Sequence, residues 1–193
     1  MKKLVVITYN QHKYHEYQRL LNDEAFELEP LSVHFQGVLE ETGNTFEANA
    51  RQKLAQVKYR PNTYYIAEDS GLEIEALNGK PGVYSARYSA SGKDKDNNLK
   101  VLKKMADVSD RRARFKAVIA LREPSGTITT FEGVCLGRIH TEMVGQEGFG
   151  YDPIFMPLPY LETFAQLGSE VKHQLSHRQK ALKKMLQYLR GVQ

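Results

Sequence analysis

The chain has 193 residues and a formal net charge of +4, with 41% hydrophobic and 26% charged residues. This composition predicts a folded domain with a sizeable core and excludes an intrinsically disordered chain. No apolar run is long enough for a membrane span or a secretory signal, so we expect a cytoplasmic protein with no membrane partner. The only cysteine, Cys135, excludes an internal disulfide and is interpreted as core filler.

The first segment predicts a strand, a polar turn and a helix. Lys3–Thr8 is a short apolar run typical of a buried strand, and Asn10 is a candidate N-cap for the helix that follows. Four residues would share the apolar face of that helix: Tyr14, Tyr17, Leu20 and Leu21. Because helix N-termini attract anions, this layout with Lys13 in the first turn suits phosphate binding. It lacks a glycine-rich P-loop, so this segment taken alone favours a capped helix with a surface lysine.

A second strand is predicted at Phe26–Leu31, followed by an acidic turn at Glu40–Gly43 and another helix. Thr45 is the expected N-cap of this helix. Its apolar face comprises Phe46, Ala50, Lys53, Leu54 and Val57. Lys53 is the exceptional member, because a lysine within an apolar face either extends its ammonium group to solvent or serves a site.

Two adjacent carboxylates, Glu68 and Asp69, are the main candidates for the chemistry of the chain. Glu68 and Asp69 follow the apolar run Tyr64–Ala67, and a half-buried strand is expected at Leu72–Ala76, so the acids are predicted to form a turn between two strands. Carboxylate oxygens together with substrate phosphates are the ligands that Mg²⁺ prefers. A solvated acidic turn is the alternative interpretation.

The next part of the chain predicts a helix and a hairpin. Lys93–Met105 has helical spacing, with Leu99, Leu102 and Met105 on one face. Ala113–Leu121 and Thr127–Phe131 predict a β-hairpin, which Val134–Ile139 extends.

The segment Gly145–Phe155 combines glycines with an aromatic residue and an acid. Phe149 between Gly148 and Gly150 could stack on a nucleobase while loop N–H groups contact the base edge, or the segment could be a tight turn around a buried phenylalanine.

A basic helix is predicted at Ser176–Leu189, with Ser176 as its N-cap. Arg178 near its start could donate to a carbonyl group of a ligand or pair with an acid.

Several segments together resemble one family. They are TYNQHK, EETGNTFEANARQK, AEDSGL, GKPGVYSARY, GFGYDPIF and LSHR, in this order from near residue 3 to about residue 190. They closely resemble the inosine triphosphate pyrophosphatase family, the XTP/dITP diphosphatases. The resemblance implies one domain over residues 1–193 with an elongated α/β fold: a long mixed sheet flanked by helices, and two lobes around a central substrate cleft. It also implies Mg²⁺ dependence, a homodimer, and hydrolysis of dITP, ITP or XTP to a nucleoside monophosphate and pyrophosphate.

The resemblance assigns roles to particular residues. Asp69 would accept a proton from the attacking water, with Glu68 and Lys53 as further catalytic residues, and Glu40 and Asp69 would bind the metal. The expected substrate contacts are Thr8, Tyr9, Asn10, Gln11, His12, Lys13, Ser70, Phe149, Gly150, Tyr151, Asp152, Lys172, His177 and Arg178.

Two positions in the central motifs depart from the family pattern. Tyr9 replaces a small residue that is usual in the phosphate turn, and Glu68 replaces the commoner aspartate, which lengthens that side chain by one methylene. The alternative hypothesis is therefore a nucleotide- or RNA-binding protein that keeps the pocket without turnover. We expect the enzyme, with no nucleic-acid partner.

Overall fold

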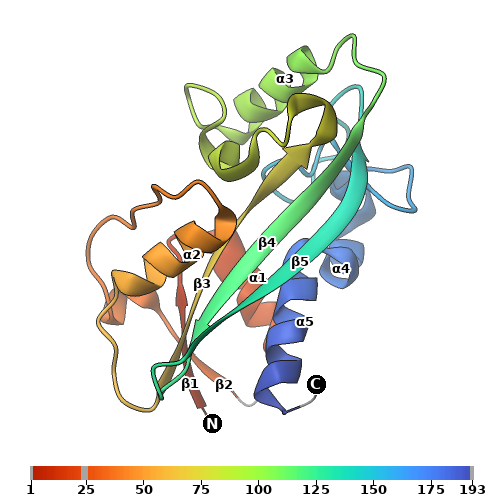
Figure 1. Ribbon diagram of the computed structural model, residues 1–193. Helices are drawn as coiled ribbons and strands as arrows, with labels where there is room; N and C mark the ends of the chain where they lie inside the picture. The colour runs from red at the N-terminus through yellow and green to blue at the C-terminus, as the bar shows by residue number, and fades with distance from the viewer. Residues whose placement is uncertain (1, 23–25, 192–193) are drawn as a thin grey trace. The chain divides into compact units, whose positions relative to one another are not determined.

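The computed structural model describes residues 2–22 and 26–191. Its helices and strands are, in chain order, β1 (Lys2–Ile7), α1 (Gln11–Leu20), β2 (Phe26–Glu29), α2 (Phe46–Ala55), β3 (Thr63–Ile74), α3 (Asp94–Lys104), β4 (Arg112–Arg122), β5 (Ile128–Ile139), β6 (Phe155–Pro157), α4 (Phe164–Leu175) and α5 (His177–Leu189). Figure 1 labels all of them except β6. Short 3-10 turns occupy Leu31–Val33, Glu75–Leu77 and Gly82–Arg87. In this described part of the chain, no helix combines the length and apolar character that crossing a membrane requires.

The described strands form a mixed sheet in the order β2-β1-β3-β4-β5-β6. β1 is parallel to β2 and to β3, whereas β5 and β6 are antiparallel. β4 and β5 are joined by a short turn in which the Glu123 N–H donates to the Thr127 carbonyl. The predicted α/β class with a mixed sheet is therefore confirmed, and the apolar run at Lys3–Thr8 does form an interior strand.

Helix starts follow the predicted capping residues. The Asn10 side chain accepts from the Lys13 N–H at the start of α1, and the Thr45 side chain accepts from the Ala48 N–H at the start of α2. At the start of α5 the Gln179 N–H donates to Ser176 Oγ at 3.1 Å. These bonds satisfy N–H groups that have no partner within the helix.

One predicted turn is wrong. Glu68 and Asp69 do not interrupt the sheet, because β3 is a single strand of 12 residues that passes straight through them. The predicted strand at Leu72–Ala76 ends at Ile74 and continues as a 3-10 turn. A carboxylate pair can occupy a buried strand only when partners satisfy its charge, and such partners come from α1 and α2.

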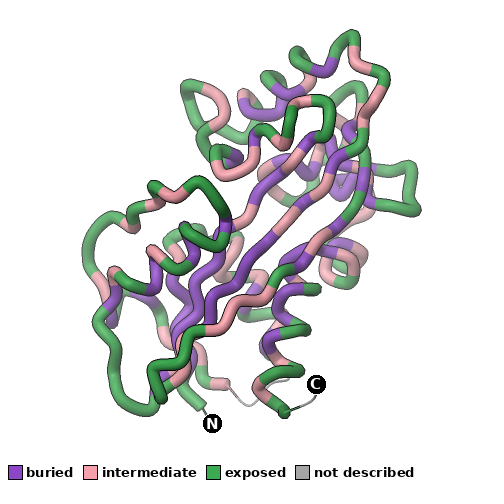
Figure 2. Tube along the Cα trace, viewed as in Figure 1, coloured by how far each residue is buried: buried purple, intermediate pink, exposed green. Residues whose placement is uncertain are grey.

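By internal contacts the chain divides into two compact units. The first consists of Met1–Asp69, Val118–Glu132 and Ala181–Gln193, and the second of Ser70–Ala117 and Gly133–Lys180. The core of the first unit includes Val5, Ile7, Leu54, Tyr65 and Ala67, each at most 1% exposed. Figure 2 shows this core as continuous buried segments along the strands. β1 is buried at its last four positions, Leu4–Ile7, and β3 at nine of its 12 positions, as expected for interior strands of a sheet with helices packed on it.

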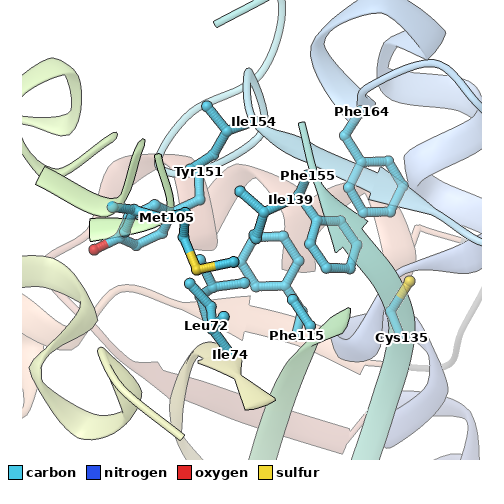
Figure 3. Packing of buried hydrophobic residues seen from close by; sticks show 12 residues of the cluster. Leu72, Ile74, Met105, Phe115, Cys135, Ile139, Tyr151, Ile154, Phe155 and Phe164 are labelled. Atoms are coloured by element: carbon cyan, nitrogen blue, oxygen red, sulfur yellow. The ribbon is translucent and has the colours of Figure 1, made fainter. Parts of the chain in front are cut away.

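The core of the second unit is rich in aromatic residues (Figure 3). The Phe115 ring lies 4.5 Å from that of Phe155 and 6.4 Å from that of Phe164, measured between centroids. Cys135 belongs to the same cluster, as predicted, and burial raises the pKa of its thiol to about 11. The thiol therefore stays protonated at neutral pH and is unreactive.

The predicted face of α3 is only partly correct. Met105 just beyond its end is fully buried, but Leu99 is 48% exposed. The inner face of the helix instead carries Asn97, Asn98 and Val101. The two asparagines can be buried there because they bond to loop backbone groups: Asn97 accepts from the Ser89 N–H, and Asn98 donates to the Gly150 carbonyl.

Candidate active site

Glu68 and Asp69 are buried on β3, with 6% and 5% of their surfaces exposed. Glu68 has a donor at each carboxylate oxygen. The Tyr17 hydroxyl donates to Oε2 at 2.6 Å, and the Lys13 ammonium lies 3.3 Å from Oε1. Both donors come from α1, one turn apart. The longer arm of glutamate at this position therefore reaches a hydroxyl and an ammonium group supplied by the first helix.

Asp69 accepts a hydrogen bond from the Asn49 side-chain amide at 2.8 Å. Burial raises the pKa of Asp69, and the positive charges of Lys53 and Lys13 act in the opposite direction. The nearby negative charge of Glu41 raises the pKa further. Asp69 is thus an acid whose ionised form is penalised by burial and supported by two lysines, an arrangement that is common at functional sites.

Lys53 is 5% exposed and does not extend to solvent. Its ammonium group donates to the Glu68 backbone carbonyl at 2.7 Å and forms an ion pair with Glu41. Of the two interpretations of Lys53 left open by the sequence, the structure supports membership of a site. We call the residues Lys13, Tyr17, Glu41, Asn49, Lys53, Glu68 and Asp69 the acid–lysine cluster; they all belong to the first unit.

The predicted metal ligand Glu40 is exposed. Its backbone is fixed by Gln56, whose side chain accepts from the Glu40 N–H at 2.8 Å and donates to the Glu40 carbonyl at 3.0 Å. The neighbouring Glu41 is the acid that pairs with Lys53. The role of Glu40 stays a prediction, and Glu41 joins the cluster as a residue that sequence reasoning missed.

The predicted phosphate turn, residues 8–13, leads into α1. The Asn10 N–H donates to Thr8 Oγ1 at 3.1 Å, and the Asn10 side chain caps the helix. Tyr9 is 48% exposed, while Gln11 and His12 are exposed at the helix start. The turn therefore places the positive end of the helix dipole and Lys13 together.

No group of three or more His, Cys, Asp or Glu residues is positioned to hold a metal ion within residues 2–22 and 26–191. Mg²⁺ does not need such a group, because it usually takes one or two carboxylates and completes its shell with water and substrate phosphates. The carboxylate of Asp69 fits this chemistry: it offers a hard oxygen donor, and a cation would relieve the penalty that burial places on its charge.

Changing Tyr17 to Phe should lower the free energy of unfolding by about 2 kcal/mol, because it removes a buried hydrogen bond to a charged acceptor. Urea denaturation followed by circular dichroism measures this loss. Tyr14→Phe is the matched control: it lies on the same helix, and its hydroxyl makes no hydrogen bond with the described residues. Equal stability of the two variants would contradict the importance of the Tyr17–Glu68 bond.

A second group surrounds the loop at residues 148–152 in the second unit. The Lys172 ammonium lies 4.1 Å from the centroid of the Phe149 ring and 2.6 Å from Asp152 Oδ2. Asp152 is 1% exposed and Lys172 8%. Because Lys172 covers one face of the Phe149 ring, a planar ligand would stack on the opposite face.

Two of the loop N–H groups that were expected to contact a base have acceptors within the protein. The Phe149 N–H donates to Asp152 Oδ2 at 2.9 Å, and the Gly150 N–H donates to Asp94 Oδ2 at 2.6 Å. Because these two N–H groups already have acceptors, side-chain donors are further candidates for contacting the edge of a ligand.

Three predicted ligand contacts lie near the start of α5 and on β3. Arg178 is 2% exposed, and its guanidinium donates to Ser70 Oγ at 3.4 Å. The His177 ring stacks on Phe115 with centroids 4.9 Å apart. The structure therefore brings Ser70 and Arg178 together, while His177 packs on the aromatic core.

Sequence reasoning missed several residues that hold these groups. Asn49 precedes Lys53 by four positions on α2, so helical spacing alone could have placed both side chains on one face. Asp94 and Asn98 have the same spacing on α3. Nothing in the spacing of these residues indicates their partner, Gly150, which lies 52 residues beyond Asn98.

A model of the Ham1 family matches residues 4–188, so the chain belongs to the Ham1 family. A protein of Staphylococcus epidermidis named dITP/XTP pyrophosphatase is 43% identical over 195 residues, covering 100% of this chain and 99% of that protein. One of the same name from Bacillus subtilis is 40% identical over 193 residues, covering 98% of each. The solved structure of the Staphylococcus aureus Ham1 protein has a TM-score of 0.88 at 39% identity, covering 100% of both chains.

Proposed function

We propose that this protein hydrolyses dITP, ITP and XTP to the nucleoside monophosphate and pyrophosphate. Two findings support the proposal: membership of the Ham1 family, with full-length relatives named for dITP/XTP pyrophosphatase activity, and the acid–lysine cluster. The single observation that carries the chemistry is a buried aspartate, Asp69, within the electrostatic reach of Lys13 and Lys53. Two lysines can stabilise the negative charge of a triphosphate, and a carboxylate can accept a proton from the attacking water.

In the proposed reaction a water molecule attacks the α-phosphorus, and the bond from that phosphorus to the pyrophosphate oxygen breaks. Asp69 accepts the proton that the water loses. Lys13 and Lys53 stabilise the negative charge of the phosphates, and Glu68 positions Lys13 through their ion pair. Mg²⁺ held by Asp69 and Glu40 would neutralise phosphate charge and stabilise the pyrophosphate leaving group.

We assign base recognition to the second unit. Phe149 would stack on the purine, and the guanidinium of Arg178 would donate to O6 of hypoxanthine or xanthine. Adenine carries a donor at that position, so it would offer the arginine no acceptor and two donors would face each other. Guanine shares O6, so its rejection must depend on the C2 position.

Two further features are proposed from the family resemblance. The protein would act in the cytoplasm, where it removes deaminated purine nucleotides before polymerases use them, and it would act as a homodimer. Sedimentation of the purified protein measures the second feature directly.

A substrate panel tests the function. Purified protein with Mg²⁺ should release pyrophosphate from dITP and XTP at least about a hundredfold faster than from dATP, since mispaired polar groups in a closed site are costly. dGTP should also be a poor substrate, and EDTA should stop all release. Equal rates on the four nucleotides would contradict the specificity, whereas nucleotide binding without pyrophosphate release would favour a binding protein.

A further inference from the structure

Helix α3 carries two residues that reach the Phe149 loop. Asp94 and Asn98 are one turn apart and share a face of the helix. Asp94 Oδ2 accepts from the Gly150 N–H at 2.6 Å, and the Asn98 amide donates to the Gly150 carbonyl at 2.8 Å. The helix therefore holds the two backbone polar groups of a single loop residue.

The orientation of Asn98 is fixed by its other bond. Its side-chain amide also donates to the Asp94 carbonyl at 2.7 Å, so both amide hydrogens have acceptors, and the residue is 1% exposed. Asp94 lies in the first turn of α3, where a carboxylate is favoured by the helix dipole. Neither residue would need to rearrange to hold Gly150.

The loop is also fixed from its other side. Gly148 and Gly150 have φ values of +82° and +63°, and a Cβ at Gly148 would lie 2.1 Å from Asp152 Oδ2. The Tyr151 hydroxyl donates to the Ser85 carbonyl at 2.7 Å. With Phe149 held through its N–H by Asp152, three successive residues have separate anchors. Of these anchors, only the one at Gly150 comes from α3.

We propose that Asp94 and Asn98 are positioning residues for purine recognition: by clamping the Gly150 peptide they hold the Phe149 ring in the orientation in which a base stacks on it. This inference rests on the proposed function, because it assumes that Phe149 receives the base. Neither residue is expected to touch the nucleotide. Their loss should therefore weaken binding while leaving the chemical step unchanged, because preformed loops bind with less ordering cost.

The test compares Asp94→Ala with Asp96→Ala. Asp96 lies in the same first turn and also carries a charge that favours the helix dipole, but its carboxylate accepts from Ser91 Oγ instead of from the loop. In Asp94→Ala we expect the Gly150 amide to exchange its hydrogen about tenfold faster without nucleotide. We also expect KM for dITP to rise about tenfold with kcat within about twofold. Asp96→Ala should change none of these quantities.

Asp94→Asn keeps an acceptor oxygen and should restore most of the KM and of the exchange protection. Equal KM values for Asp94→Ala and Asp96→Ala would overturn the inference, as would unchanged exchange at Gly150. The proposed function fails separately, if the wild-type protein itself releases no pyrophosphate from dITP.

Discussion

Asp69→Asn should lower kcat for dITP by about a thousandfold or more, measured as pyrophosphate release at saturating Mg²⁺. The expected loss has two parts. Removing a general base typically costs two to four orders of magnitude, and an amide is a weaker ligand for Mg²⁺ than a carboxylate. The change is nearly isosteric, and asparagine can still accept the hydrogen bond from Asn49. A large loss would therefore report on the charge and basicity of Asp69 rather than on its shape.

Two further variants test whether the loss of kcat is specific to the carboxylate of Asp69. Asp107→Asn removes a carboxylate from an exposed residue and should leave kcat unchanged. Glu68→Gln should reduce activity less than Asp69→Asn, because Glu68 already has Tyr17 and Lys13 at its two oxygens. If Glu68→Gln were the more damaging change, the proton acceptor would have to be reassigned to Glu68.

The stability of Asp69→Asn should change in the opposite direction from its activity. Burial raises the pKa of Asp69 in the folded protein above its ordinary value of 3.8. Ionisation of Asp69 is therefore less favourable in the folded protein than in the unfolded chain, and it lowers the free energy of unfolding. Asparagine avoids that cost. In EDTA at pH 7 the variant should unfold at a higher urea concentration than wild type, and the difference should vanish as the pH falls below about 4, where both wild-type states are protonated. Lower stability at pH 7 would contradict this sign.

Local features of the fold could be predicted from the sequence. Asn10, Thr45 and Ser176 cap their helices as expected, because a cap depends on a side chain and a backbone N–H three residues away. Strand β1 follows from the uninterrupted apolar run Leu4–Ile7, and β4 from the run Ala117–Leu121 in its second half. Helix α4 was not predicted; Gly168 within it has φ +80°, and the helix is kinked there.

Features that depend on distant partners could not be predicted in the same way. Glu68 and Asp69 suggested a turn because adjacent acids are usually solvated, yet they lie inside β3. What permits their burial is Tyr17, 51 residues earlier, and Asn49, 20 residues earlier. The family resemblance indicated which residues matter, but only the folded structure shows that Glu41 pairs with Lys53 and that α3 holds Gly150.

Lys172→Met should lower the free energy of unfolding by about 3 kcal/mol, measured by urea denaturation at pH 7. Lys172 and Asp152 form an ion pair at 2.6 Å, with side-chain exposures of 10% and 2%. Removing one member leaves the other charge buried without its partner, which is more costly than losing the attraction itself. Lys183→Met on the exposed face of α5 is the matched control and should change stability by less than about 0.5 kcal/mol.

The double variant Lys172→Met with Asp152→Asn separates the cost of a buried charge that has lost its partner from the loss of the attraction itself. It leaves no unpaired buried charge, and asparagine can still accept from the Phe149 N–H, so its loss of stability should be smaller than the sum of the two single losses by about 2 kcal/mol. Additive losses would show that the two charges are not coupled. The double variant lacks the ammonium group over the Phe149 ring but keeps the acceptor for the Phe149 N–H. A higher KM for dITP in the double variant than in Asp152→Asn alone would therefore assign Lys172 a role in recognition beyond its role in the fold.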